Sequence, residues 1–346
     1  MRGVVPLGNQ RVEVREIPDP VAGPGEVIVE VKSAGVCGSD LHAFRKSWEE
    51  IGERQGLVIG HEAGGIVKEV GQGVSSSLIG RRVSVYHYRG CGVCRHCLSG
   101  NLMLCKDKRG YGWHVHGADA ALLLTDARNC CELPQQLSFD DGAILACAAG
   151  TAYSALRKLE RIEAEGYLAV FGLGPVGLSA AILAKAKGLR AIGIDLSIEK
   201  GKFARAMDIA VLENPGTNLS EALRQTMGGE LPRMVFDATG SERGLESALE
   251  TVGIGGGVVT VGKGMWPLRF TDKIDVADLI RKQICFMGSW VLPLSYYYDM
   301  VDLMLSAGVT FSAMVTARFP VEEAQAAFEK ANDPGGVGKV MLTWDR

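Results

Sequence analysis

The chain has 346 residues, of which 47% are hydrophobic and 22% charged, and its formal net charge is −3 at pH 7. This length predicts about two domains, each large enough to bury its own core. The composition excludes the strongly basic surface that nucleic-acid or anionic-membrane binding requires, and it favours a small-molecule partner. The N-terminus lacks a long apolar core and no apolar run of about 18 residues follows, so we expect a cytoplasmic protein without a signal peptide or membrane span.

The first 130 residues are predicted to form a β-rich domain. Short runs rich in β-branched residues occur at 27–32, 65–70 and 82–85, and a further strand-like segment occupies 120–124. Glycine and proline bound most of these runs, as is typical of short strands joined by tight turns.

The segment Cys37-Gly38-Ser39-Asp40-Leu41-His42 combines a thiol, a hydroxyl, a carboxylate and an imidazole in six residues. A thiolate binds Zn²⁺ well and an imidazole titrates near neutral pH, so Cys37 could hold a Lewis acid while Ser39 and His42 move a proton. A glycine-containing turn with a buried thiol is the alternative interpretation.

Two further segments carry candidate ligands for the same metal. A glycine-flanked turn at 60–64 contains His61 and Glu62, which could bring an imidazole and a carboxylate to Cys37. The alternative interpretation is a polar pair in a loop that is solvated at the surface. Cys147 lies in a run of small residues that could pack closely and offer its thiol to that site, or leave it buried without a function. The cysteines without ligand spacing, which we expect to be spectators, are Cys130, Cys131 and Cys285.

A lobe at 90–106 holds four cysteines, Cys91, Cys94, Cys97 and Cys105. Four thiolates predict a closed, tetrahedral structural zinc site, and the glycines at 90, 92 and 100 allow the chain to wrap tightly round the ion. Disulfides would explain the cysteines but not the repeated two-residue gap, whereas a redox dithiol or an iron–sulfur site remains open. We expect His96 to be a loop residue and not a fifth ligand.

From residue 149 the pattern changes to alternating strands and helices, which predicts a parallel sheet with helical crossovers. A strand at 167–171 leads into Gly172-Leu173-Gly174-Pro175-Val176-Gly177, and a helix is expected at 178–187. The glycines permit a tight turn and close approach of the backbone to a pyrophosphate at the helix N-terminus. This context predicts a dinucleotide site.

A second strand at 191–194 ends in Asp195, 18 residues after Gly177. A carboxylate at this point hydrogen-bonds the adenine-side ribose and repels a 2′-phosphate, which predicts NAD as the cofactor. Lys200 could contact the same ribose. The remaining elements expected in this half are strands at 233–238, 257–262 and 284–289, a helix opening at Tyr296, a helix at 319–330 and a closing strand at 338–342.

Taken together and in this order, these motifs resemble the zinc-dependent medium-chain alcohol dehydrogenases, nearest to the sorbitol and threonine dehydrogenase-like branch. The resemblance covers essentially the whole chain. It implies an α/β protein in which residues 1–148 and 291–346 form a GroES-like catalytic domain, and residues 149–290 form an inserted Rossmann domain with a doubly wound parallel sheet. The active site would lie in the cleft between them.

The resemblance also implies residue roles. Cys37, His61 and Cys147 would hold a catalytic zinc, with water, substrate or Glu62 in the remaining position, and the four-cysteine lobe would hold a second, structural zinc. Ser39 would take the substrate proton and pass it through the nicotinamide ribose to His42, while Asp40 would orient a ligand. Thr151 and the glycine fingerprint would contact NAD. The residues expected to line the substrate pocket are His87, Trp48, Trp113 and Trp290.

The implied activity is oxidation of an alcohol to a ketone or aldehyde by hydride transfer to NAD, with secondary alcohols, polyols and hydroxy amino acids as candidate substrates. A homodimer or homotetramer without nucleic-acid or membrane partners is expected. One alternative is a zinc-independent quinone or enone reductase of the same fold, which would normally lack this combination of cysteines and histidine. Another is a non-enzymatic zinc-binding module, which the net charge of −3 disfavours.

Overall fold

The computed structural model describes residues 1–162, 166–212, 218–262 and 274–344. The chain divides into two compact units. The first comprises Met1–Cys147, Leu292–Asp299 and Thr310–Arg346, and the second comprises Ala148–Val291 and Met300–Val309. Among the described residues, no helix is both long and apolar enough to cross a membrane.

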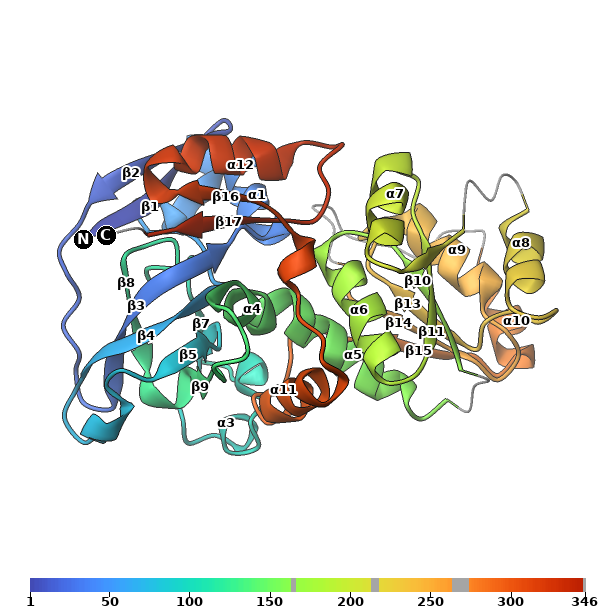
Figure 1. Ribbon diagram of the computed structural model, residues 1–346, viewed down its shortest axis with the longest axis horizontal. Helices are drawn as coiled ribbons and strands as arrows, with labels where there is room; N and C mark the ends of the chain where they lie inside the picture. The colour runs from blue at the N-terminus through green and yellow to red at the C-terminus, as the bar shows by residue number, and fades with distance from the viewer. Residues whose placement is uncertain (163–165, 213–217, 263–273, 345–346) are drawn as a thin grey trace. The chain divides into compact units, whose positions relative to one another are not determined.

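A mixed sheet forms the centre of the first unit (Figure 1). Its strand order is β16-β17-β3-β4-β5-β9, and β8 also pairs with β3. The antiparallel pairing of β3 with β4 places Val31 opposite Gly65, and Val27, Val29 and Val31 are fully buried on the core side. The strands are β3 (Glu26–Gly35), β4 (Ala63–Val70), β5 (Arg82–Val85), β8 (Leu122–Asp126), β9 (Cys130–Glu132), β16 (Val315–Pro320) and β17 (Lys339–Thr343).

Smaller elements complete this unit. Asn9 and Gln10 adopt positive φ angles in the turn between β1 (Arg2–Gly8) and β2 (Arg11–Glu16), a hairpin that the sequence pattern did not reveal. A second small ribbon pairs β6 (Tyr88–Arg89) with β7 (Arg109–Gly110). The helices are α1 (Gly38–Arg45), α2 (Trp48–Ile51), α3 (Arg95–Leu98), α4 (Phe139–Ile144) and α12 (Ala324–Asn332). Turns of 3₁₀ helix lie at Gly52–Arg54, Ser76–Leu78, Leu102–Leu104, Ala127–Asn129, Ser312–Met314 and Val321–Glu323.

Two expectations for this unit were wrong. The helix predicted at 319–330 begins only at Ala324, because Phe319 pairs with Leu342 and is therefore part of β16. His96 does not lie in a loop but in the short helix α3, in which one helical turn separates Cys94 from Cys97.

The second unit contains a parallel sheet with the order β12-β11-β10-β13-β14-β15 among the described residues. In chain order this is 3-2-1-4-5-6, the strand order of the doubly wound dinucleotide-binding fold. The strands are β10 (Tyr167–Phe171), β11 (Arg190–Ile194), β12 (Ala210–Val211), β13 (Met234–Asp237), β14 (Gly257–Thr260) and β15 (Cys285–Gly288). The helices are α5 (Gly150–Leu159), α6 (Pro175–Ala186), α7 (Ile198–Ala206), α8 (Leu219–Thr226), α9 (Glu242–Thr251) and α10 (Val276–Arg281). Helix α11 (Tyr296–Ala307) has residues in both units.

The helix predicted at 178–187 begins three residues earlier, at Pro175. Gly174 is its N-cap and Pro175 occupies the first turn, where a missing backbone N–H costs nothing. The earlier start places the last four residues of the glycine fingerprint at the helix N-terminus, where a pyrophosphate would be bound.

Candidate active site and cofactor site

Asp40 connects the start of α1 to a histidine on another segment. One carboxylate oxygen accepts the backbone N–H of Cys37 at 3.0 Å, which closes the first turn of the helix. The other oxygen lies 3.2 Å from Nδ1 of His61, and both side chains are buried. If Nδ1–H donates to Asp40, Nε2 of His61 keeps its lone pair for a metal.

The turn before β4 places His61 and Glu62 beside this helix. Gly60, at φ 87°, starts the turn, and a Cβ on this residue would overlap the Asp119 carboxylate. Only glycine fits such a position without strain. Both side chains that follow are almost completely buried, His61 at 3% and Glu62 at 0% exposed. A polar pair solvated on the surface is therefore excluded.

Cys147 lies in a turn of π-helix, Leu145–Ala149, that follows α4. Such wide turns often occur at functional sites, and this one was not evident from the sequence. His87 donates a 2.7 Å hydrogen bond from Nδ1 to the Ala146 carbonyl, and so fixes the backbone next to Cys147. Burial lowers the pKa of His87 to about 3, so the ring is neutral at physiological pH.

The ligand atoms of Cys37, His61, Glu62 and Cys147 all lie within 4.8 Å of one another. A hydrogen bond between the two thiols lowers the pKa of Cys37 and raises that of Cys147. Burial alone would lower the pKa of His61, but the Asp40 and Cys37 charges outweigh it and hold that pKa well above its usual value. Two thiols, an imidazole and a carboxylate this close together are a donor set that fits Zn²⁺.

Lys339 is the residue of this site that the sequence did not suggest. It is 2% exposed, and its Nζ lies 2.9 and 2.7 Å from the two carboxylate oxygens of Glu62. Burial raises the pKa of Glu62 to about 8, and the Lys339 charge acts in the opposite direction. The available signal was a lysine at the start of β17, directly before three apolar residues.

The candidate proton-transfer and pocket residues differ in how close they lie to this set. Ser39 and His42 are one turn apart on α1, a spacing that puts both on one helix face. The rings of Trp113 and His87 lie 4.7 and 5.2 Å from the ring of His61. Trp48, at 38% exposed on α2, has no described contact with the set, and Trp290 belongs to the second unit.

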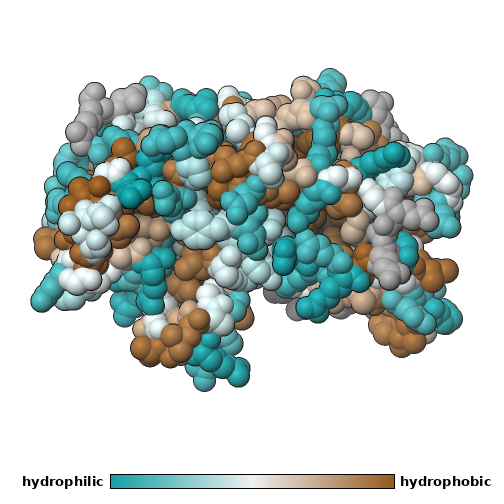
Figure 2. Space-filling view, turned by 60° about the horizontal axis from the view of Figure 1, so that its bottom comes forward, coloured by the Kyte–Doolittle hydropathy of each residue, from teal (hydrophilic) through white to brown (hydrophobic). Residues whose placement is uncertain are grey.

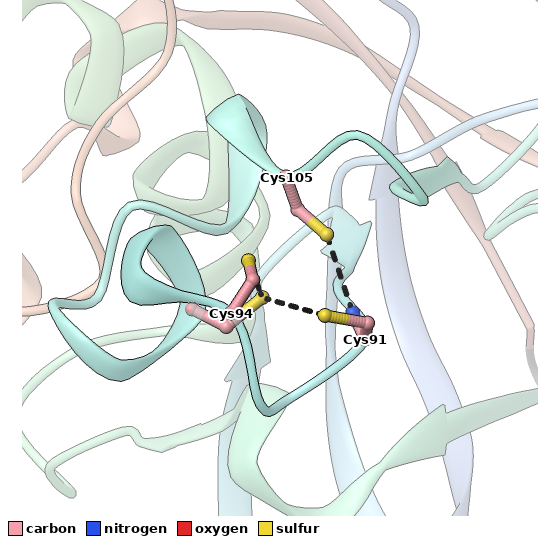
Figure 3. Close-up of side chains that lie close together, drawn as sticks. Cys91, Cys94 and Cys105 are labelled. Carbon is pink, nitrogen blue, oxygen red and sulfur yellow. Dashed lines mark hydrogen bonds between the residues drawn. The ribbon is translucent and has the colours of Figure 1, made fainter.

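The four cysteines of the lobe form a second donor set, with their sulfurs also within 4.8 Å of one another. Figure 3 shows three of them, Cys91, Cys94 and Cys105, close together. Cys97 Sγ lies 3.6 Å from Cys94 Sγ and 4.0 Å from Cys91 Sγ, close to the roughly 3.8 Å expected for sulfurs around a tetrahedral zinc. Backbone N–H groups of Val93 and Cys94 lower the pKa of Cys91 to about 6, which favours the thiolate needed for a metal.

The glycine fingerprint of the second unit borders a cavity of about 710 Å³. Gly172 (φ 87°) directly follows β10, and a Cβ on Gly177 would overlap the Gly172 carbonyl, so both positions require glycine. The lining residues that were predicted cofactor contacts are Gly172, Gly174, Asp195 and Lys200. Pro175, Val176 and Gly177 belong to the adjoining start of α6, and Thr151 lies in α5.

Asp195 also has a structural task. Its carboxylate accepts backbone N–H groups from Leu173 and Ser197, both at 2.8 Å. The first of these bonds ties the fingerprint loop to the end of β11. The cavity has a second wall from α9, which includes Arg243 and Glu250 and which the sequence analysis had not assigned to the cofactor.

Comparison with known proteins agrees with this geometry. The family model "Alcohol dehydrogenase GroES-like domain" matches residues 23–135, and "Zinc-binding dehydrogenase" matches residues 175–306. The chain is 33% identical to the uncharacterized zinc-type alcohol dehydrogenase-like protein YphC of Escherichia coli, over 97% of each chain. It is 30% identical to the L-threonine 3-dehydrogenase of Saccharopolyspora erythraea, over 96% of each chain. The solved structure of alcohol dehydrogenase TADH from Thermus sp. ATN1 matches over 100% of both chains with a TM-score of 0.90 and 29% identity.

These matches extend over both units; the first unit contains two donor sets that fit zinc, and the second contains a dinucleotide cavity. They exclude a non-enzymatic zinc-binding module, and the two donor sets disfavour the zinc-independent reductase. The chain belongs to the zinc-containing medium-chain alcohol dehydrogenases, a family of NAD-dependent oxidoreductases.

Proposed function

We propose that this enzyme oxidises a secondary alcohol to a ketone with NAD, and that polyols and hydroxy amino acids are among its candidate substrates. The observation that carries the proposal is the close set of Cys37, His61, Glu62 and Cys147, in which the histidine and the glutamate are buried and Asp40 orients the histidine. A zinc ion held there supplies Lewis-acid chemistry that lowers the pKa of the substrate hydroxyl. The relation to an L-threonine 3-dehydrogenase, named for a secondary hydroxyl, supports this substrate class.

The protein's own residues would handle the proton and the cofactor. Ser39 takes the proton of the substrate hydroxyl, and His42, one turn later on the same helix face, transfers it towards solvent. Asp195 accepts the ribose hydroxyls of NAD and repels the 2′-phosphate of NADP. Lys339 pairs with the Glu62 carboxylate and would balance its charge beside the metal.

We also propose that the two domains are residues 1–148 with 291–346, and residues 149–290.

We further propose that the assembly is a homodimer or homotetramer. The exposed apolar side chains near the outer edge of the parallel sheet support an oligomer, because such groups are usually covered. Phe286 and Trp290 are 40% and 44% exposed, and Figure 2 shows hydrophobic patches on one face of the molecule. Light scattering coupled to size-exclusion chromatography tests this directly.

The experiment for the activity is a substrate panel. Secondary alcohols, polyols and 3-hydroxy amino acids are each offered with NAD, and reduction is followed by absorbance. The proposal predicts that at least one class is oxidised with NAD preferred over NADP. Activity confined to the reduction of quinones or enones would refute it.

A further inference from the structure

Arg54 is linked to the candidate catalytic metal site through a single aromatic ring. Its guanidinium carbon lies 4.8 Å from the centre of the Trp113 ring, and the centre of the same ring lies 4.7 Å from that of the His61 ring. Arg54 is anchored at the end of a 3₁₀ turn, where its Nε–H donates a 2.9 Å hydrogen bond to the Gly112 carbonyl. The ring of Trp113 therefore lies between the guanidinium of Arg54 and the candidate metal ligand His61.

The hydrogen-bonding capacity of this guanidinium is not used up. Nη2 of Arg54 is buried and has no acceptor within hydrogen-bond distance among the described residues. The free energy of removing such a donor from water is recovered only when an acceptor is supplied. Arg54 as a whole is partly exposed, and an anion that reached Nη2 would supply the acceptor that this buried atom lacks.

The described acidic side chains do not supply an acceptor or an ion-pair partner for Arg54. Asp40, the carboxylate whose charge acts on Arg54, is fully buried and already accepts from Cys37 while contacting His61. By contrast Arg89, another partly buried arginine of the same unit, forms ion pairs with both Glu26 and Asp126. Among the described residues Arg54 has no such ion pair within 4 Å, so the missing counter-charge has to come from elsewhere.

We propose that Arg54 binds a carboxylate or phosphate group of the alcohol substrate, whose reacting hydroxyl lies at the set formed by Cys37, His61 and Cys147. A planar guanidinium matches both anions through two parallel N–H···O bonds. The single ring between Arg54 and His61 suits a short substrate, such as a 3-hydroxy acid or a small polyol phosphate. This inference rests on the proposed alcohol oxidation and narrows its substrate class.

The test compares pairs of substrates in which one member carries an anionic group that the other lacks. For the carboxylate arm, 3-hydroxybutyrate is compared with 2-butanol, in which a methyl group replaces the carboxylate. For the phosphate arm, glycerol 1-phosphate is compared with glycerol. Wild-type kcat/KM should be greater for the charged member of at least one pair, by about ten- to a hundredfold, as expected for a charge-assisted pair of hydrogen bonds.

Three variants assign that preference. Arg54→Met should reduce the charged-to-uncharged ratio of kcat/KM to within a few fold, and Arg54→Lys should restore part of that ratio. Arg82→Met is the matched control, because Arg82 also stacks on an aromatic ring, that of Phe139 at 4.3 Å, and donates to a carbonyl, that of Leu137. It should leave the ratio unchanged whatever it does to stability.

A second readout does not depend on turnover of a charged substrate. Butyrate and inorganic phosphate are tested as competitive inhibitors of 2-butanol oxidation, and Arg54→Met should raise the inhibition constant of at least one of them about tenfold or more. If the wild type oxidises 2-butanol but prefers neither charged partner and neither anion competes, the inference is overturned and the proposed function stands. If Arg54→Met and Arg82→Met change the ratio equally, Arg54 has only a packing role. If the zinc-loaded enzyme oxidises no member of either pair nor any alcohol of the wider panel, the proposed function fails and the inference fails with it.

Discussion

Replacing Lys339 with methionine should destabilise the first unit far more than the loss of an ordinary ion pair. Both members of the Lys339–Glu62 pair are buried, at 2% and 0% exposed, and the ammonium contacts both carboxylate oxygens. Methionine fills much of the same volume but leaves Glu62 without a counter-charge. Breaking a buried pair in this way typically costs about 3–5 kcal/mol, a large share of the roughly 5–15 kcal/mol by which a domain is stable.

A partly exposed ion pair, Lys32 with Glu30, provides the matched control. Lys32 and Glu30 lie 2.9 Å apart with side chains 26% and 18% exposed, so Lys32→Met should cost no more than about 1 kcal/mol. The double variant Lys339→Met/Glu62→Gln should recover most of the loss, because the remaining amide carries no charge.

The assay is hydrogen exchange of peptides from β3 and β17 during denaturant titration, which reports on this unit alone. Zinc content is measured in parallel. Two results would contradict this prediction: an equal loss of unfolding free energy in Lys339→Met and Lys32→Met, or no recovery of it in the double variant. Either would show that Lys339 does not neutralise a buried charge on Glu62.

Three further predictions follow from the cofactor cavity, from α1 and from His87. Asp195→Ser should raise KM for NAD and shift the kcat/KM ratio towards NADP, and steady-state kinetics that show a wild type already preferring NADP would contradict the assigned role. His42→Ala should slow alcohol oxidation about ten- to a hundredfold, mostly at or below neutral pH, with partial recovery in small-amine buffers; a pH–rate profile identical to that of the wild type would exclude the relay. Burial lowers the pKa of His87 to about 3, whereas an exposed histidine has a pKa of roughly 6.5. Between these two pH values the unfolded chain binds one proton more than the folded protein. The free energy of unfolding should therefore fall by about 1.4 kcal/mol per pH unit as the pH falls below about 6.5. Denaturation of His87→Gln at pH 7.5 and 5 should show a smaller loss than the wild type, and an equal loss would place the acid sensitivity in other groups.

The residues of the structural zinc lobe and of the dinucleotide site could be predicted because each group lies in a short local motif. The spacing of Cys91, Cys94 and Cys97 implies a metal lobe on its own, and the glycine fingerprint with Asp195 implies a dinucleotide site. The structure brings Cys37, His61 and Cys147 within 4.8 Å although they are spread over 110 residues, and this grouping came from a family resemblance and not from spacing.

The residues that were missed act through contacts between distant segments. Lys339 meets Glu62 across 277 residues, and neither flanking sequence indicates the other. The π-helical turn at Cys147 differs from an α-helix by one shifted hydrogen-bond register, which an alanine-rich sequence does not specify. The stacking of Arg54 on Trp113 joins two loops that hydrophobic periodicity leaves undefined.

We infer that two zinc sites with different tasks serve one NAD-dependent alcohol oxidation. Elemental analysis of purified wild type, Cys37→Ser and Cys97→Ser, combined with activity and thermal unfolding, tests this inference. We expect two zinc ions per wild-type chain. Cys37→Ser should lose one zinc and its activity while it keeps its fold, and Cys97→Ser should lose mainly stability. A single zinc in the wild type, or the same loss of activity and stability in both variants, would contradict it.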